Sequence, residues 1–484
     1  MEELNFGVVP WGLSVVMLAV AAFRLRRLRP DWTHALVLLV ALLASAVVLP
    51  LSRIVIEGHE AEYLEILLGQ RGLDAGDTAR MPAMQCLLRG LGWLGVGQRG
   101  AQAVSLLFGG LACVSWSAAL GRLASRWVGL AAGLSLALWG NLAAWSSSVY
   151  NVVLPFFFVC VAFWALSLLL DGEEPVGAGL LAGAAAGMAV SLRLDTVWVA
   201  PAGLLLVLLA QPKGWRRWMP GLLLGAGVAL SSVLAVRGSG ELPGSGEWAN
   251  SFAMNAALFV YFEPFQRLWV LPAVLIGLGL GLRARWRVAL PLVVLLLSTH
   301  FAMAGFNDYG SRHLLGAGLT LSAGLGFCLS RRLAWVPLAI AALGLMFSLV
   351  DMRLRFYASE DAFAQALNSE LPEWSLQDLR GCALISEDTR IAQEGEQLSH
   401  FNLWNADELA DLQAQHGCVL WLMGVQDFRW SSLAVRDRAL RVERLYELEP
   451  LAVVSNPEDG YVGLVLRVER ARRWPSASLV RTLP

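Results

Sequence analysis

The sequence predicts an α-helical polytopic membrane protein with a small soluble α/β domain at its C-terminal end. Apolar residues make up 57% of the 484 residues, and charged residues only 15%. The mean hydropathy is +0.57, which is far above the average of soluble domains. The apolar residues also form long blocks, each close to the roughly 20 residues that cross a hydrocarbon layer about 30 Å thick.

These apolar blocks predict about twelve membrane-spanning helices. The block at 196–210 is short for a span, so it needs polar flanks or a shared interior face to cross. The long polar segment at 52–99 is expected to be an outer loop of the transmembrane domain, which we assign to residues 1–351. The predicted spans are 6–23, 33–51, 100–120, 127–143, 149–170, 176–192, 196–210, 218–236, 268–282, 288–304, 313–330 and 333–350.

Basic residues predict the orientation of the spans, because positively charged loops stay on the cytoplasmic side. They follow the first, third, seventh, ninth and eleventh spans, and the remaining odd-numbered junction at 171–175 carries none. We therefore expect a multi-pass protein of a bacterial inner (plasma) membrane, with the N-terminus and the C-terminal domain in the periplasm. The basic residues concerned are Arg24, Arg26, Arg27, Arg29, Arg122, Arg126, Lys213, Arg216, Arg217, Arg283, Arg285, Arg287, Arg331 and Arg332.

The first block could also be interpreted as a cleaved secretory signal. Such a signal needs a basic region before its apolar stretch. Here the chain begins with Met1-Glu2-Glu3, and the arginines follow the block. An uncleaved span is therefore the better interpretation.

Residues 352–484 have the composition of a soluble protein, and we expect them to form a periplasmic α/β domain. A helix with Asn405 as its N-cap is expected between the first two strands. Cys382 and Cys418 each follow a glycine at the start of a strand, so they could pair in an oxidising compartment or remain two buried thiols. The strand-like apolar runs are 382–385, 418–422 and 461–466.

The first outer loop concentrates titratable side chains directly after a predicted span. Glu57, His59 and Glu60 are followed by Glu62 on a segment with an apolar stripe, which predicts a helix along the membrane surface. On that helix Glu60 and Glu62 point about 200° apart. At most one of these two carboxylates therefore needs to be functional. Solvation of the whole cluster is the ordinary alternative.

This arrangement resembles the polytopic glycosyltransferases of the GT-C class, which use polyprenyl-phosphate sugars. The class includes the protein O-mannosyltransferases and the lipid A aminoarabinose transferase. In this family the first outer loop carries an acidic pair, a tyrosine and a helix, similar to His59-Glu60-Ala61-Glu62-Tyr63. A basic, proline-containing turn follows, similar to Arg80-Met81-Pro82.

Three later segments carry the resemblance further, and in all it covers roughly residues 33–330. The segment 145–151, which runs into 156–158, looks like the helix–turn–helix of the family, and 191–195 is similar to the segment where the family has a basic residue. Arg312-His313-Leu314-Leu315 resembles an Arg-Tyr-Leu-Leu stretch that opens a late helix. The sequence departs from the family at His59, where an aspartate is usual, and beside Pro82, where a second proline is common.

The resemblance implies transfer of a sugar from a polyprenyl-phosphate donor to a lipid, glycan or protein acceptor. A carboxylate would take the proton of the acceptor hydroxyl, with Glu60 as first candidate, Glu57 as second and His59 as a further base. Arg80, Arg193 and Arg312 would hold the phosphate of the donor. Snorkelling of each arginine to the membrane interface is the alternative.

Other classes of function remain open at this stage. One alternative is a non-catalytic relative that binds a lipid-linked sugar, because His59 stands where the family usually has aspartate. Another is a secondary transporter, because the number of spans also suits that class. Membrane lipids are expected partners, and nucleic acid is not. The sequence predicts no cofactor, shows no zinc-ligand spacing, and leaves a requirement for a divalent metal ion open.

Overall fold

The chain divides into two compact units, which are described separately. A helical unit comprises Met1–Arg53 and Glu62–Arg353, and a sheet unit comprises Ile54–Ala61 and Leu354–Pro484. The structure is a computed structural model. It describes residues 2–25, 31–48, 63, 66–67, 82–146, 152–212, 214–237, 271–303, 315–328, 339, 342–346, 382–386, 414, 418–424, 446–456 and 461–471.

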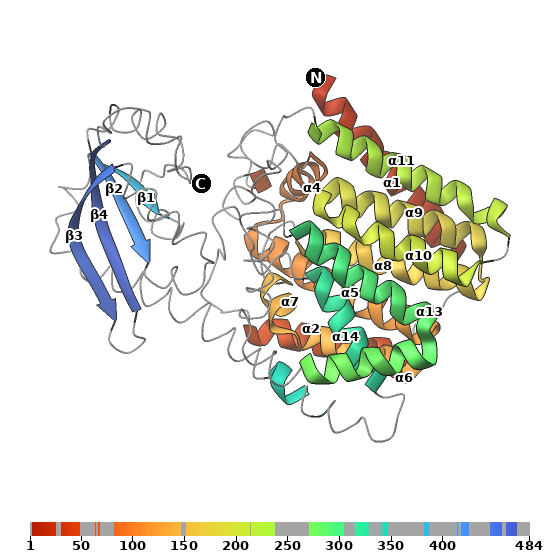
Figure 1. Ribbon diagram of the computed structural model, residues 1–484. Helices are drawn as coiled ribbons and strands as arrows, with labels where there is room; N and C mark the ends of the chain where they lie inside the picture. The colour runs from red at the N-terminus through yellow and green to blue at the C-terminus, as the bar shows by residue number, and fades with distance from the viewer. Residues whose placement is uncertain are drawn as a thin grey trace, which may run out of the picture. The chain divides into compact units, whose positions relative to one another are not determined.

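The helical unit is a bundle of long apolar helices (Figure 1). The described elements are α1 (Glu2–Leu25), α2 (Trp32–Val48), α4 (Pro82–Trp93), α5 (Gln98–Leu123), α6 (Arg126–Ala137), α7 (Gly140–Ser146), α8 (Val153–Asp171), α9 (Pro175–Leu192), the 3₁₀ helix η2 (Leu194–Val199), α10 (Ala200–Ala210), α11 (Trp215–Arg237), α13 (Leu271–Met303) and α14 (Leu315–Cys328).

Most described helices coincide with predicted spans to within a few residues. Within the described part of the chain, three helices are long and apolar enough to cross a membrane by length and composition: Arg99–Leu123, Val153–Asp171 and Pro175–Leu192. Shorter apolar helices cover four further predicted spans. Most of the predicted span 333–350 lies outside the described residues, so the count of twelve spans stays a prediction.

Three predicted spans differ from the structure in their continuity. The span predicted at 127–143 is divided between α6 and α7, because the helix ends at Leu138 before it resumes. The predicted spans 268–282 and 288–304 are joined in α13, where only Arg285 departs from helical geometry, with φ −144° and ψ 46°. A single residue therefore makes the change of direction for which the sequence suggested a short loop.

The bundle exposes apolar side chains, and hydrogen bonds join different helices in its interior, as expected of an integral membrane protein. Leu204 and Leu223 are each more than 60% exposed. Inside, the Trp116 indole N–H donates to Ser322 Oγ at 2.9 Å, and Thr320 Oγ1 donates to the Leu292 carbonyl at 2.7 Å. Such interhelical bonds are stable in lipid because no water competes for the donors.

Helices α9 and α11 pack through small residues. A Cβ atom added at Gly179 would lie 2.5 Å from the Trp218 carbonyl oxygen, and one at Gly183 would overlap the Gly221 carbonyl oxygen. Glycine at these positions lets the two backbones approach closely. Glycines of α9 between Gly177 and Gly187 therefore serve helix packing.

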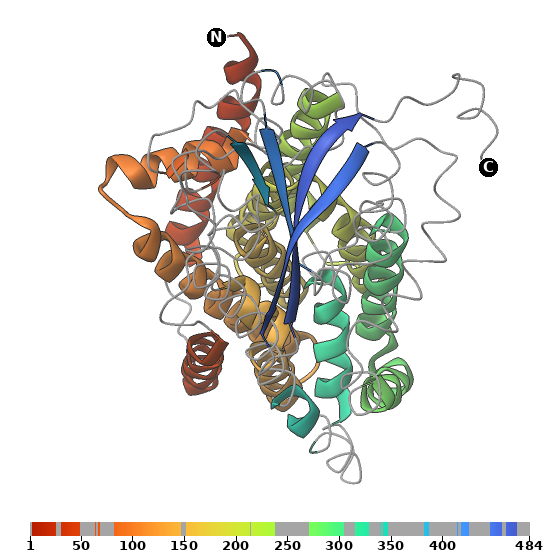
Figure 2. The same ribbon diagram turned by 90° about the vertical axis from the view of Figure 1, so that its left-hand side faces the viewer.

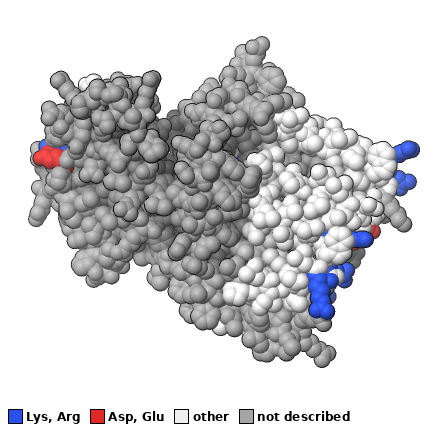
Figure 3. All heavy atoms as spheres, in the orientation of Figure 1, with Lys and Arg blue, Asp and Glu red and all other residues white. Residues whose placement is uncertain are grey.

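Contacts between helix ends bring several basic junctions together at one end of the bundle, here called the arginine end. A Cβ atom at Gly177 would contact Arg24 and Leu25, so α1 ends where α9 begins. Ion pairs join Arg122 to Asp171 and Arg126 to Asp31 at the same end. In the space-filling view, described Lys and Arg side chains gather at the right-hand edge (Figure 3). Because α9 runs from this end to Leu192, the opposite end is here called the Arg193 end.

The sheet unit contains four described strands: β1 (Cys382–Ser386), β2 (Cys418–Gly424), β3 (Tyr446–Asn456) and β4 (Tyr461–Ala471). Their order is β1-β2-β4-β3 (Figure 2). The first two strands pair in parallel, and the other pairs are antiparallel. All three predicted strand runs lie on strands, and β3 is one that the sequence did not suggest. The helix predicted after Asn405 lies outside the described residues.

The two cysteines of the sheet unit stand at matching positions. In the parallel register Cys382 lies opposite Cys418, and Cys418 is disulfide-bonded. Strands in a sheet lie about 4.8 Å apart, within the distance that a disulfide spans. Cys86, Cys113, Cys160 and Cys328 are free.

Candidate functional site

Arg193 is the one predicted site residue that the structure describes. The other predicted residues, Glu57, His59, Glu60, Arg80 and Arg312, lie outside the described residues. The candidate site is therefore built from Arg193 and from the segments that flank the others in sequence.

Arg193 occupies the break between two helices. Helix α9 ends at Leu192, and Arg193 adopts an extended backbone with φ −161° and ψ 113°. Its N–H still donates to the Ala189 carbonyl at 2.9 Å, while its own carbonyl accepts a 2.7 Å hydrogen bond from Thr196 Oγ1. This threonine bond competes with regular helical bonding, which fits the tighter η2 turn that follows. The residue is thus held by backbone bonds on both sides.

The burial of Arg193 distinguishes it from an interfacial arginine. Arg193 is only 9% exposed, and it is not without an interaction partner. A snorkelling arginine instead extends its guanidinium group away from the protein to the interface. Burying a guanidinium group is costly unless partners compensate it. The snorkelling interpretation therefore does not apply to Arg193.

A hydroxyl group from another helix anchors the segment that follows Arg193. Ser298 Oγ of α13 donates to the Trp198 carbonyl of η2 at 2.8 Å, across 100 residues of sequence. The bond supplies a donor to a carbonyl in a short 3₁₀ segment. Sequence reasoning did not single out Ser298, because a serine within an apolar helix gives no sign of a distant partner.

The chain that follows the carboxylates of the first outer loop packs on α4. Tyr63, Ile66 and Leu67 are buried. The Arg89 guanidinium of α4 donates to the Ile66 carbonyl at 3.4 Å, and a Cβ atom at Gly92 would overlap the Leu67 carbonyl oxygen. Only a residue without a side chain allows this close approach. Ile66 and Leu67 are therefore held against α4.

Helix α4 and Arg193 lie at the same end of the bundle. Helix α4 packs against both α1 and α9, and Figure 1 shows it beside α1 near the N-terminus of the chain. The other end of α1 is at the arginine end. Within the described residues, Arg193 and the chain at Ile66 and Leu67, which contacts α4, therefore lie at the same end of the helical unit.

The segment that resembles the helix–turn–helix of the family contributes an aromatic cluster. Helix α7 precedes α8, and a Cβ atom at Gly109 of α5 would overlap Ser146 Oγ of α7. Phe157 of α8 stacks at 5.0 Å on Phe108 and at 5.1 Å on Phe158. Such aromatic pairs stabilise helix packing beyond their buried area. This segment is therefore a packing element in the described structure.

A metal site is absent from the described residues: no group of three His, Cys, Asp or Glu side chains is close enough to hold an ion. The predicted acidic loop is outside this search. The described part of the candidate site is therefore a buried cation on a rigid backbone break, an arrangement suited to an anionic ligand.

Comparisons with known proteins identify the fold. No family model and no curated protein matches the chain. The crystal structure of ArnT from Cupriavidus metallidurans in the apo state is similar with a TM-score of 0.52 and 14% identity, over 89% of this chain and 97% of ArnT. The crystal structure of the same protein bound to undecaprenyl phosphate has a TM-score of 0.47 and 13% identity, over 90% and 97%.

The chain thus has a fold similar to that of ArnT, in agreement with the family that its sequence resembles. At 14% identity this likeness concerns the fold alone.

Proposed function

We propose that this protein is a GT-C glycosyltransferase that moves a sugar from a polyprenyl-phosphate donor to an acceptor at the periplasmic face of the bacterial inner membrane. The observation that carries the proposal is the buried Arg193 at the break between α9 and η2, within a fold like that of ArnT, a lipid A aminoarabinose transferase. Folds host many functions, so the chemistry has to be argued from the site.

The donor phosphate is the group for which Arg193 is suited. When the sugar leaves, negative charge develops on the polyprenyl phosphate, and a pre-positioned guanidinium group stabilises that charge. Burial strengthens the interaction because water is excluded. The bonds from Thr196 and Ser298 fix the backbone around Arg193. Arg80 and Arg312 complete the proposed phosphate site.

The proton of the acceptor hydroxyl needs a base on the other side of the sugar. We assign this role to Glu60, with Glu57 as second choice and His59 as hydrogen-bond partner. Ile66 and Leu67, which follow these residues in the sequence, are held against α4. Transfer forms the bond between the acceptor oxygen and the sugar C1, and it releases the polyprenyl phosphate.

The sheet unit supports the periplasmic orientation. Cys418 is disulfide-bonded, and we infer that Cys382, its register partner, supplies the other sulfur. Disulfides persist in oxidising compartments such as the bacterial periplasm. For the helical unit, the positive-inside rule independently assigns the arginine end to the cytoplasmic side.

The decisive experiment tests the base. Purified full-length protein should consume a polyprenyl-phosphate sugar, followed by thin-layer chromatography of the lipid. Glu60→Gln keeps the size of the side chain and removes the base, so transfer should fall by about a hundredfold or more, with unchanged thermal melting. Glu62→Gln is the matched control, because its side chain is predicted to point elsewhere.

The outcomes separate the alternatives. Full activity of Glu60→Gln with loss in Glu57→Gln would move the base to Glu57, and full activity in both would exclude a carboxylate mechanism. Wild-type protein that binds the donor without consuming it would support the second candidate function, a non-catalytic relative. The observation that favours this candidate is His59 at a position where the family usually has aspartate.

A further inference from the structure

A cavity of about 390 Å³ opens at the arginine end of the helical unit, away from the proposed active site. Its size falls within the range of small-molecule pockets, about 300–1,000 Å³. Four helices contribute charged, polar and aromatic side chains to its wall. They include Asp31, His34, Arg122, Arg126 and Trp164.

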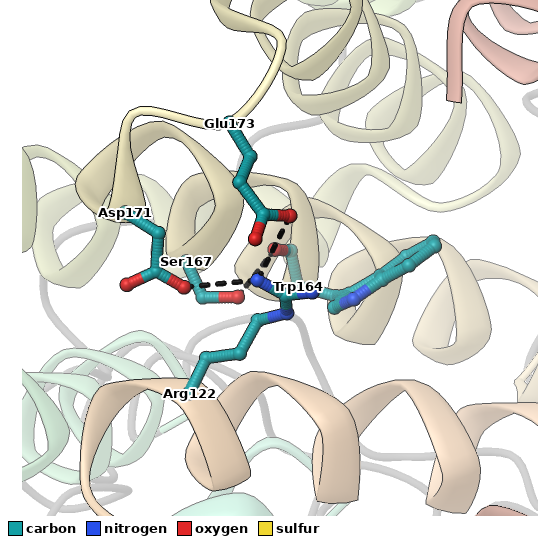
Figure 4. A network of polar contacts seen from close by, with 5 residues as sticks. All are labelled: Arg122, Trp164, Ser167, Asp171 and Glu173. Atoms are coloured by element: carbon teal, nitrogen blue, oxygen red, sulfur yellow. Dashed lines mark hydrogen bonds and ion pairs between the residues drawn. The ribbon is translucent and has the colours of Figure 1, made fainter. Parts of the chain in front are cut away.

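The two arginines of the cavity retain donors for a ligand. Arg122 Nη1 contacts Asp171 Oδ2 at 2.9 Å and Glu173 Oε2 at 3.1 Å, with Trp164 beside it (Figure 4). Arg126 Nη2 contacts Asp31 Oδ1 at 2.9 Å. A guanidinium group has five N–H donors, and among the described residues these ion pairs engage one nitrogen of each arginine. The other N–H groups suit the oxygens of a phosphate.

The imidazole of His34 adds a further donor. Its Nδ1 accepts a 3.0 Å hydrogen bond from the backbone N–H of Asp31. In the neutral ring the proton is then on Nε2, which can donate to an anionic group. Thr33 and Ser117 contribute hydroxyl groups to the same wall.

The described wall of the cavity carries both signs of charge. Arg122 and Arg126 line it together with the Asp31 carboxylate, whereas Asp171 and Glu173 contact Arg122 from outside the lining. A purely anionic ligand would place a like charge beside the Asp31 carboxylate. A zwitterion avoids this cost, because its phosphate can meet the guanidinium groups while its ammonium group meets a carboxylate.

The position of the cavity favours a lipid as the source of such a zwitterion. Trp32 and Trp127, at the start of α2 and α6, are 57% and 58% exposed. Exposed tryptophans at the ends of apolar helices mark the headgroup level of a bilayer. The cavity wall also includes Leu25, Val114 and Ala118, which suit the apolar start of a lipid tail.

We propose that this cavity binds the headgroup of a zwitterionic phospholipid with a primary ammonium group. The phosphate lies between Arg122 and Arg126 and accepts from His34, and the ammonium group donates to Asp31. The lipid would tie together the chain segments before α2, between α5 and α6, and after α8. The site is independent of the chemistry at the Arg193 end.

The test compares lipids that differ only in their headgroups. Detergent-purified full-length protein is delipidated and melted with dioleoyl phosphatidylethanolamine, phosphatidylcholine or phosphatidylglycerol. Phosphatidylethanolamine should raise the Tm by about 2–4 °C and remain bound in native mass spectrometry. Phosphatidylcholine should give a smaller shift, because its trimethylated ammonium has no N–H to donate. Equal shifts with all three lipids, or a larger one with phosphatidylglycerol, would overturn the proposal.

Two variants and a soluble analogue complete the test. Asp31→Asn keeps the size of the side chain and removes its charge, so phosphatidylethanolamine retention should fall by about tenfold. Arg216→Gln, an arginine outside the cavity at the same end, should retain the lipid like wild type. Unchanged retention in Asp31→Asn would contradict the assigned ammonium partner. A full Tm shift with soluble phosphoethanolamine, without retention of the lipid, would exclude a lipid as the occupant.

Discussion

The two ends of the helical unit use arginine in different ways. At the arginine end, the side chains of Arg122 and Arg126 are 28% and 48% exposed and form ion pairs with nearby carboxylates. At the other end, Arg193 is 9% exposed and sits where a helix breaks. Exposed arginines with partners in adjacent loops fit a role in topology, whereas a buried arginine requires a specific reason. The two roles of arginine are therefore separated by burial and not by the residue type.

The two ends of the helical unit should differ most in their accessibility to a reagent outside the cell. Single cysteines introduced at Gly72, Gly246 and Ser375 should react with an impermeant thiol reagent in intact spheroplasts. Arg285→Cys, at the arginine end, should be protected. Labelling of Arg285→Cys together with protection of the other three would reverse the orientation.

The free thiol Cys86 can itself react with the thiol reagent and so give background labelling in this experiment. Burial raises the pKa of the Cys86 thiol, and the thiolate is the reactive form. Background labelling should therefore be slow at neutral pH and increase at higher pH, as the thiol ionises.

Removal of a single guanidinium group should affect activity at one end only. Arg193→Gln should lower sugar transfer by about tenfold to hundredfold, the effect of losing a hydrogen bond to a charged group. Arg193→Lys keeps the charge and should recover part of the rate. Arg216→Gln at the arginine end should leave transfer unchanged. If Arg193→Gln is folded and fully active, the proposed phosphate role is wrong.

Substitution of Ser298 should have a smaller and more indirect effect on sugar transfer. Ser298→Ala removes the hydrogen bond to the Trp198 carbonyl, worth about 0.5–1.5 kcal/mol, and loosens the segment after Arg193. We expect KM for the donor to rise by about twofold to tenfold. Ser231→Ala is the matched control, because Ser231 Oγ bonds only within its own helix, to the Val228 carbonyl. Equal effects in both variants would mean that Ser298 has no positioning role.

The ion pairs of Arg122 should have the smallest effect of all, and that effect should be on stability. The Asp171 and Glu173 side chains are 41% and 46% exposed, and exposed pairs of this kind contribute about 0–1 kcal/mol. Arg122→Gln should lower the Tm by no more than a few degrees. The shift should shrink further in high salt, which screens exposed charges. A loss of folding would show that this pair is a structural requirement.

Much of the helical unit could be predicted because apolar block length is a local property of sequence. The predicted span 176–192 and the observed α9 agree to within a residue. The single-residue change of direction at Arg285 could not be predicted, since its backbone geometry depends on how the two halves of α13 pack on α14. The anchoring of Trp198 by Ser298 was equally invisible, because the two residues are 100 positions apart.

The sequence by itself determined that this is a membrane protein, which ends of its helices carry positive charge, and where strands form in the C-terminal part. These properties follow from hydropathy, charge and alternation within short windows of the chain. Only the tertiary structure decided that Arg193 is buried, that α9 and α11 meet through glycines, and that Asp31, His34, Arg122 and Arg126 surround one cavity. The physical reason is that burial and shared cavities depend on contacts between distant segments, which no local pattern records.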